Sequence, residues 1–217
     1  MSAKSELLGA IAGLNRGLLV AKDEKQEILD AVKRVEDENP TPQPLQAADK
    51  LDGDWRLLYT TSSELLGIDR LPFYDLGQVY QCIRVKDAAI YNVAEVQGIP
   101  YLGGLISVAA RYEAVSEKRV NVRFERAVFG LQRLIQYQSL SPFIDQMETG
   151  KKFTAIDFEI KNRDQKGWLD VTYLDHDMRI GRGNQGSVFV LTKVPSASSP
   201  SAQSTHRDES QPEGSMS

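Results

Sequence analysis

Asp175-His176-Asp177 is the segment whose residue types come nearest to a catalytic or metal-binding group. A histidine beside carboxylates can act as a general base or bind a metal ion. Neighbouring residues of an extended strand point to opposite faces, however, so these three side chains do not converge there. His206, the second histidine, lies in a polar tail. We therefore expect Asp175-His176-Asp177 to form a solvated turn between two strands.

Residues 181–186, Gly-Arg-Gly-Asn-Gln-Gly, match the spacing G-x-G-x-x-G of dinucleotide-binding loops. Such a loop needs a helix directly after it, because the helix N-terminus holds the pyrophosphate. Here the glycines stand between two strand-like runs. They are better explained as turn formers, and the segment 183–186 is typical of a hairpin connection.

Cys82 is the single cysteine, so it forms no disulfide within the chain. It lies in a strand-like apolar run, which favours a buried structural thiol, because a reactive thiol needs electropositive, accessible surroundings. Asp157 and Glu159 share one face of a strand and do not form a convincing hydrolase pair. The sequence predicts no catalytic residue, no metal site and no cofactor.

Two amphipathic helices are predicted in residues 1–40, because apolar residues recur three and four apart in residues 7–14 and 28–35. Gly17 is a plausible end of the first helix. Asp23 is expected to cap the second, with Gln26 completing a capping box. The helical pair either packs on the main domain or binds a partner or a membrane surface.

From residue 51 the apolar residues alternate with polar ones, which predicts eight or nine strands. They are expected at residues 55–60, 79–85, 90–96, 105–115, 119–129, 152–161, 168–174, 178–182 and 187–194. Most connections are short, and parallel strands need long crossovers, so the strands form an antiparallel meander. Closure into a barrel removes the open edges and leaves room for one small ligand; a flat sandwich fits the pattern less well.

The domain organisation expected is therefore an N-terminal helical part (1–40), a β-barrel (51–194) and a disordered tail (195–217) that is rich in Ser and Pro. Two connections, 61–77 and 131–150, are too apolar to be exposed to solvent. We expect them either to plug the barrel, to cover its mouth or to contact a membrane.

The overall charge is −4 and the barrel region is neutral, which argues against a nucleic-acid partner. The longest apolar run, 99–110, is too short to span a bilayer, and no signal or transit peptide is visible. We expect a soluble or peripheral protein.

Four segments together resemble the fibrillin family, also called plastid lipid-associated proteins: residues 15–19, 51–62, 76–83 and 173–191. The resemblance implies a lipocalin-like barrel. Gly53-Asp54-Trp55 is similar to the Gly-x-Trp of the lipocalin first strand, where the Trp closes the barrel base and an arginine packs over it. Arg179 or Arg182 could supply that arginine through a cation–π contact. The resemblance implies that these residues are structural and contact no ligand.

The family resemblance also implies binding or transport of carotenoids, quinones, fatty acids or other lipids at thylakoid membranes or lipid bodies, without catalysis. It is consistent with a cyanobacterial member or a mature plastid form. The sequence does not decide which face of each strand points inward. Candidate ligand-binding residues are therefore large apolar side chains of the strands: Leu57, Tyr59, Tyr80, Tyr91, Leu105, Tyr112, Phe124, Phe158 and Tyr173. The alternatives are a structural coat of lipid droplets or membranes, and a lipocalin-shaped enzyme such as a chromophore lyase.

Overall fold

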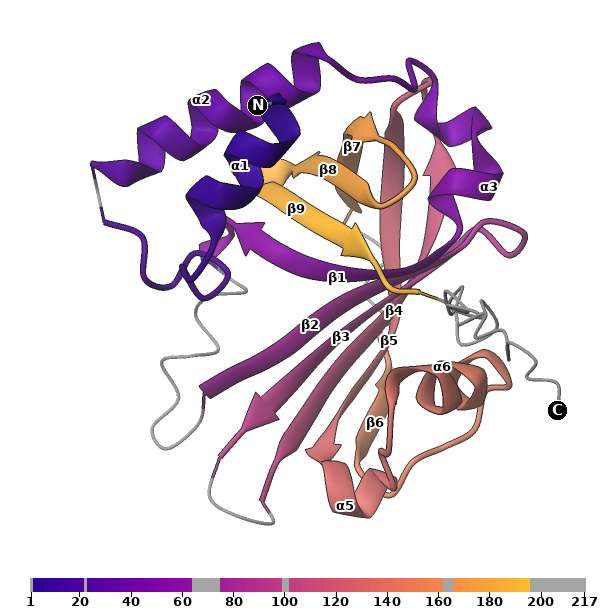
Figure 1. The fold of residues 1–217 in the computed structure, drawn as a ribbon. Helices are drawn as coiled ribbons and strands as arrows, with labels where there is room; N and C mark the ends of the chain where they lie inside the picture. The colour runs from indigo at the N-terminus through magenta and orange to yellow at the C-terminus, as the bar shows by residue number, and fades with distance from the viewer. Residues whose placement is uncertain (1, 22, 64–74, 99–101, 162–165, 196–217) are drawn as a thin grey trace, which may run out of the picture.

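The computed structural model describes residues 2–21, 23–63, 75–98, 102–161 and 166–195. Their strands form one sheet in the order β4-β3-β2-β1-β9-β8-β7-β5-β6, and β4 also pairs with β5. The strands are β1 (Gly53–Thr60), β2 (Asp75–Arg84), β3 (Ala89–Gln97), β4 (Gly104–Ala114), β5 (Arg119–Leu131), β6 (Ile156–Glu159), β7 (Lys166–Leu174), β8 (Met178–Gly183) and β9 (Val188–Lys193). The β4–β5 pairing closes eight of them into an antiparallel barrel (Figure 1), which confirms the predicted mainly-β fold.

Strand β5 has two successive partners along one of its edges. Residues 119–123 pair with β7, whereas residues 126–129 pair with the short strand β6. Arg126 holds β6 in place, because its guanidinium donates to both carboxylate oxygens of Asp157 at 2.9 and 2.7 Å. The strand predicted over 152–161 is therefore shorter than expected, and β6 is an addition to the eight-stranded ring.

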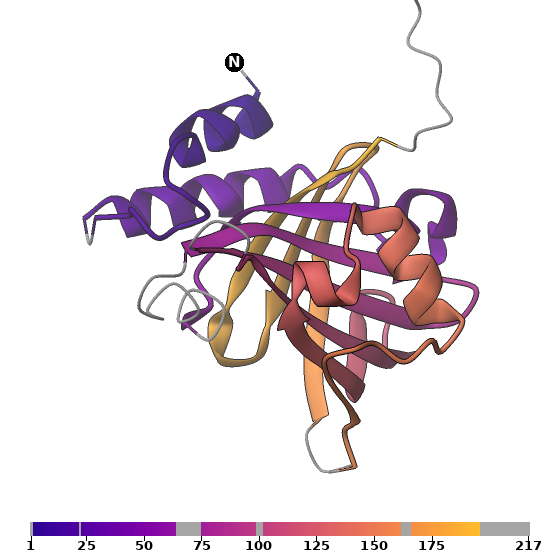
Figure 2. The same cartoon turned by 90° about the horizontal axis from the view of Figure 1, so that it is seen from below.

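Helices α1 (Ala3–Ile11) and α2 (Glu24–Asp37) pack on the outer face of β1 and β7–β9, as Figures 1 and 2 show. Their apolar stripes share one buried cluster with the outward residues of these strands: Ala3, Leu7, Ile11, Ile28, Ala31, Val32, Val35, Tyr59, Tyr173, Met178, Ile180, Val188 and Val190. Arg182 joins the two layers, because its Nε and Nη2 donate to the Glu36 carboxylate at 2.8 and 2.7 Å. This arrangement places the helical pair on the barrel.

The helix ends differ from the prediction in two places. Asp23 makes no capping bond because its own backbone is helical (φ −73°, ψ −35°), and Gln26 donates to Asp30 instead. Helix α1 ends at Ile11, so Gly17 is not its end. Gly17 has φ +107°, and a Cβ there would lie 2.5 Å from the carbonyl oxygen of Thr60, so glycine lets this segment approach β1.

Residues 131–150 also differ from expectation. They form α5 (Gln132–Ile135) and α6 (Leu140–Glu148), which cover the outside of β2–β5 instead of plugging or capping the barrel. Their contacts form a second buried cluster: Cys82, Ala89, Tyr91, Val93, Leu105, Val128, Ile135, Phe143, Ile144, Met147 and Phe153. The connection is apolar because it packs on a sheet face that would otherwise be exposed.

The remaining elements are η1 (Pro44–Gln46), α3 (Ala48–Leu51) and η3 (Asn184–Gly186), which joins β8 to β9. Most of the apolar connection 61–77, the start of the 99–110 run and the tail beyond residue 195 lie outside the described residues. Within the described residues, none of the helices combines the length and apolar character that crossing a bilayer requires.

Candidate ligand cavity

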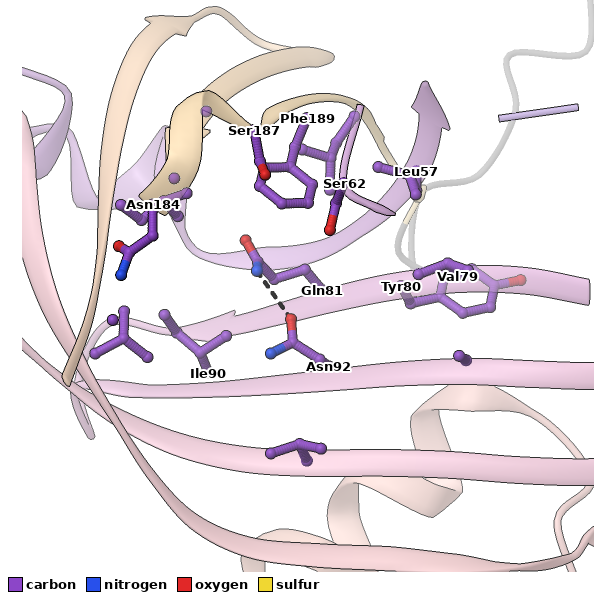
Figure 3. Close-up of a pocket in the computed structure, with 18 of the residues that line it drawn as sticks. Leu57, Ser62, Val79, Tyr80, Gln81, Ile90, Asn92, Asn184, Ser187 and Phe189 are labelled. Carbon is purple, nitrogen blue, oxygen red and sulfur yellow. Dashed lines mark hydrogen bonds between the residues drawn. The ribbon is translucent and has the colours of Figure 1, made fainter. Parts of the chain in front are cut away.

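The barrel contains a cavity of about 750 Å³ that is partly open to the surface, within the range of about 300–1,000 Å³ that is typical of small-molecule sites. Inward side chains from β1–β5 and β7–β9 line it, since alternate residues of each strand point inward. Its apolar lining includes Leu57, Val79, Ile90, Val93, Ala94, Ile106, Val108, Val122, Phe124, Trp168, Leu169, Phe189 and Leu191. Figure 3 shows Leu57, Val79, Ile90 and Phe189 around this space.

Trp55 is fully buried at the end of the barrel where α3 leads into β1. Its Nε1 donates to the carbonyl oxygen of Leu51 at 3.0 Å, so the indole is satisfied without solvent. Leu51, Trp55 and Leu57 belong to a third buried cluster, which includes inward residues of β2, β7 and β9. Trp55 therefore packs α3 against the barrel interior.

Arg179, and not Arg182, is the arginine that packs over Trp55. The Cζ atom of Arg179 lies 5.2 Å from the centroid of the indole, a cation–π distance. Arg182 points outward to Glu36, as described above. Gly53 begins β1 with φ +123°, which strongly favours glycine, and a Cβ there would meet Cε of Lys193 at 3.1 Å.

Three polar side chains interrupt the apolar lining, two on the neighbouring strands β2 and β3 and one on β8. Nη2 of Arg179 donates to Oε1 of Gln81, and Nε2 of Gln81 donates to Oδ1 of Asn92 at 2.9 Å. Figure 3 shows the Gln81–Asn92 bond between Ile90 on one side and Val79 on the other. All three polar residues line the cavity. The lining is thus mainly apolar, and these three polar side chains lie together on its wall.

Burial, with no carboxylate paired to Arg179 among the described residues, sets the electrostatics of this position. Desolvation lowers the pKa of Arg179 to about 9, because the charged guanidinium loses its water. Its Nε has no hydrogen-bond partner among the described residues. The cationic form still predominates at neutral pH, so the wall carries a buried positive charge.

Further polar groups lie across the space from Gln81 and Asn92. Ser62, Ser187 and Asn184 occupy that side in Figure 3. The Oδ1 of Asn184 accepts from the backbone nitrogen of Trp168 at 2.7 Å, and Asn184 is exposed. These groups come from the ends of β1, β8 and β9, where the cavity lining meets the surface.

Three of the nine candidate ligand-binding residues border the cavity: Leu57, Tyr80 and Phe124. Tyr80 is a special case because its ring also packs against the cluster under α6. Leu57 and Phe124 are inward residues of β1 and β5.

The other six are not among the residues that line the cavity. Tyr59 and Tyr173 lie under the N-terminal helices. Tyr91 and Leu105 lie under α6, and Tyr112 packs beside the Trp55 cluster. Phe158 is 47 % exposed on β6 and stacks on Phe129, with ring centroids 6.2 Å apart.

Two β-bulges explain the positions of Tyr59 and Tyr173. The register shifts between Leu57 and Tyr59 in β1, and between Val171 and Tyr173 in β7. Because an inserted residue changes which face the next side chain occupies, Leu57 points inward while Tyr59 points outward. The same change of face separates Val171 from Tyr173.

Sequence reasoning overlooked Gln81 and Asn92 as site residues. A signal was present, because each stands at an inward position between apolar inward neighbours, as in Val79-x-Gln81-x-Ile83. A polar side chain inside a barrel is unusual enough to indicate either a structural network or a ligand contact.

The segment Asp175-His176-Asp177 forms the β7–β8 turn, as expected. The Asp175 carboxylate accepts from the backbone nitrogens of Asp177 and Met178 and from Lys4, and these partners outweigh burial and lower its pKa. No cluster of metal-ligating side chains occurs in the described part of the chain. Burial raises the pKa of the Cys82 thiol far above its usual value.

The chain matches the PAP_fibrillin family model over residues 1–192. It is 31 % identical to a chromoplast-specific carotenoid-associated protein of Cucumis sativus, over 89 % of this chain and 68 % of that protein. It is 33 % identical to a light-induced chloroplastic protein of Solanum tuberosum (88 % and 66 %) and 31 % identical to a plastid-lipid-associated protein of Citrus unshiu (88 % and 67 %). The chain thus spans about two thirds of these relatives. No solved structure matches it significantly.

Proposed function

Since the chain belongs to the PAP_fibrillin family, we propose that its barrel binds a small apolar molecule and stores or carries it without catalysing a reaction. The observation that carries this proposal is the 750 Å³ cavity with its apolar lining. Burial of apolar surface contributes about 25 cal/mol per Å², before the cost of ordering the ligand. The ligand classes that fit are carotenoids, quinones, fatty acids and related lipids.

The names of the relatives support lipids as partners. One is carotenoid-associated and another is plastid-lipid-associated, and both are plastid proteins. We propose a similar location for this chain, either in a plastid or at the cytoplasmic side of cyanobacterial thylakoid membranes.

The lining of the cavity favours binding over the lyase alternative. Acid–base catalysis needs a converging acid or base within reach of the substrate. Among the described lining residues, the titratable side chains are Arg179 and Tyr80, and Tyr80 has its pKa raised, mainly by burial. Neither forms a proton-transfer pair with a carboxylate or histidine in this lining.

The proposal is tested by extracting the natively purified protein with organic solvent and identifying the released molecules by mass spectrometry. We expect one class of apolar lipid or isoprenoid in stoichiometric amount. The variant Ile106→Trp, which enlarges an inward side chain, should retain much less of it. Equal recovery from this variant and from Glu113→Trp, an exposed position on the same strand, would contradict a cavity site.

A coat on lipid surfaces is a second candidate, supported by a different observation. Ile156 and Phe158 on β6 are 67 % and 47 % exposed, and Leu134 on α5 is 54 % exposed. Figure 1 shows α5 beside β6 at one end of the molecule. Sedimentation with liposomes tests this candidate: Ile156→Ser with Phe158→Ser should abolish binding, whereas unchanged sedimentation would refute a role for this surface.

A further inference from the structure

We infer that the cavity selects an amphipathic ligand with a carboxylate head, which Arg179 and Asn92 bind at the wall while the apolar chain lies along the lining. This inference rests on the proposed binding function and specifies its ligand class.

Arg179 is a buried cation that has few hydrogen-bond partners among the described residues. Its side chain is 1 % exposed and borders the cavity, yet only Nη2 has a hydrogen-bond partner among the described residues, and that partner is the neutral amide of Gln81. Nε is buried without a partner there. A buried cation without a counter-charge is costly, and a bound anion removes that cost.

Lys193 differs from Arg179 in its polar partners. Lys193 is the other cation beside Trp55, at 5.2 Å from the ring centroid. Its Nζ donates to the carbonyl oxygen of Lys50 at 2.7 Å and to that of Asp49 at 3.4 Å. The negative charge of Asp52 also acts on Lys193 and favours its charged form. Lys193 therefore has polar partners within the fold, whereas Nε of Arg179 has none among the described residues.

The neighbouring amides add directional donors. Oε1 of Gln81 accepts from Arg179, and Nε2 of Gln81 donates to Asn92, so the Gln81 amide is oriented by both neighbours. Asn92 uses its oxygen in that bond, which leaves its Nδ2 donor without a hydrogen-bond partner in the described part of the chain. Arg179 and Asn92 thus offer N–H groups, and an acceptor-only head such as a carboxylate is their complement.

Apolar residues surround this position, so a long chain has a place to lie. In the register of the sheet, Val79 pairs with Ala94 and Ala94 with Ile106, one inward step along the strands from Gln81 and Asn92. Ile90 flanks the amides on the other side (Figure 3). A charged head at the wall and an aliphatic chain along these residues would satisfy both kinds of lining.

The first arm of the test compares dodecanoic acid with dodecan-1-ol by isothermal titration calorimetry on the full chain. We expect the acid to bind about 10- to 100-fold more tightly, the range that charge-assisted hydrogen bonds supply. Asn92→Leu should reduce this ratio, while Asn121→Leu, the same change at an exposed position of β5, should leave it unchanged. Arg179→Met should bring the ratio near one.

The second arm needs no variant, because Arg179→Met could fail to fold. In ¹³C NMR of bound [1-¹³C]dodecanoic acid, the carboxyl resonance should titrate with a pKa below that of the free acid. Titration as in water, or equal affinities for acid and alcohol, would overturn the carboxylate inference while leaving apolar binding intact. Failure of both ligands to bind would instead contradict the proposed function, and the inference with it.

Discussion

Arg179 and Trp55 pack against each other inside the barrel, with the guanidinium carbon 5.2 Å from the indole centroid. Both side chains are fully buried, and they come from β8 and β1, which lie on either side of β9. The contact therefore ties the first strand of the barrel to its final hairpin. It also brings a cation to the wall of the cavity, since Arg179 is one of the lining residues.

Removal of Trp55 should destabilise the barrel strongly. Trp55→Ala leaves a large cavity and deprives the Leu51 carbonyl of its donor, so we expect the free energy of unfolding to fall by about 3–5 kcal/mol. Trp168→Ala is the matched control, because Trp168 is only partly buried. Urea denaturation measures both. Equal losses would show that Trp55 has no special role in closing the barrel.

The Arg182–Glu36 pair should hold α2 on the barrel. Arg182→Gln removes a bidentate ion pair, so amide hydrogen exchange in Glu24–Asp37 should become faster while the strands keep their protection. Arg34→Gln is the control, since its contact with Glu6 is 3.9 Å long and exposed. Exchange that is unchanged in Arg182→Gln would mean that apolar packing alone docks the helix.

The Arg126–Asp157 pair predicts loss of stability in acid. Arg126, together with the backbone N–H of Phe153, lowers the pKa of Asp157 to about 2, so the ionised carboxylate stabilises the folded state. This contribution, about 2 kcal/mol, is fully present above the unfolded-state pKa and disappears as the pH falls from about 4 through 2.

In Asp157→Asn this part of the acid dependence should be absent. Urea denaturation of both proteins between pH 2 and pH 7 measures it. The same pH dependence in both proteins would contradict the assignment to Asp157.

Cys82 should be unreactive in the folded protein. Its thiol is fully buried, and burial raises its pKa, so almost no thiolate exists at neutral pH. We expect alkylation by iodoacetamide to proceed only as fast as the barrel opens, and rapidly in urea. Fast labelling under native conditions would show that the α6 side of the barrel opens readily.

Much of the fold was predictable, because antiparallel strands with short turns leave a regular alternation in the sequence. The barrel and the helical pair follow from that pattern, and the packing of an arginine over Trp55 follows from the family resemblance. The sequence does not decide whether Arg179 or Arg182 packs over Trp55, because that depends on which strand face points inward. Arg179 lies inside and Arg182 outside, three residues apart on one strand.

The cavity lining was harder to predict, for two physical reasons. Bulges in β1 and β7 reverse the alternation, so Tyr59 and Tyr173 pack under the helices. Strands β3 and β4 are covered on both faces, since α6 packs outside them, so Tyr91 and Leu105 are buried without facing the interior. Apolar alternation reports burial, and it distinguishes inside from outside only where one face meets water.

Titration with Nile red, a neutral apolar dye, tests the claim that the barrel cavity binds an apolar molecule. We predict saturable binding by the natural sequence, and at least a tenfold higher Kd for Ile106→Trp with an unchanged Kd for Glu113→Trp. Circular dichroism checks that both variants remain folded. Equal affinity in all three proteins would contradict the claim and place the bound dye outside the barrel.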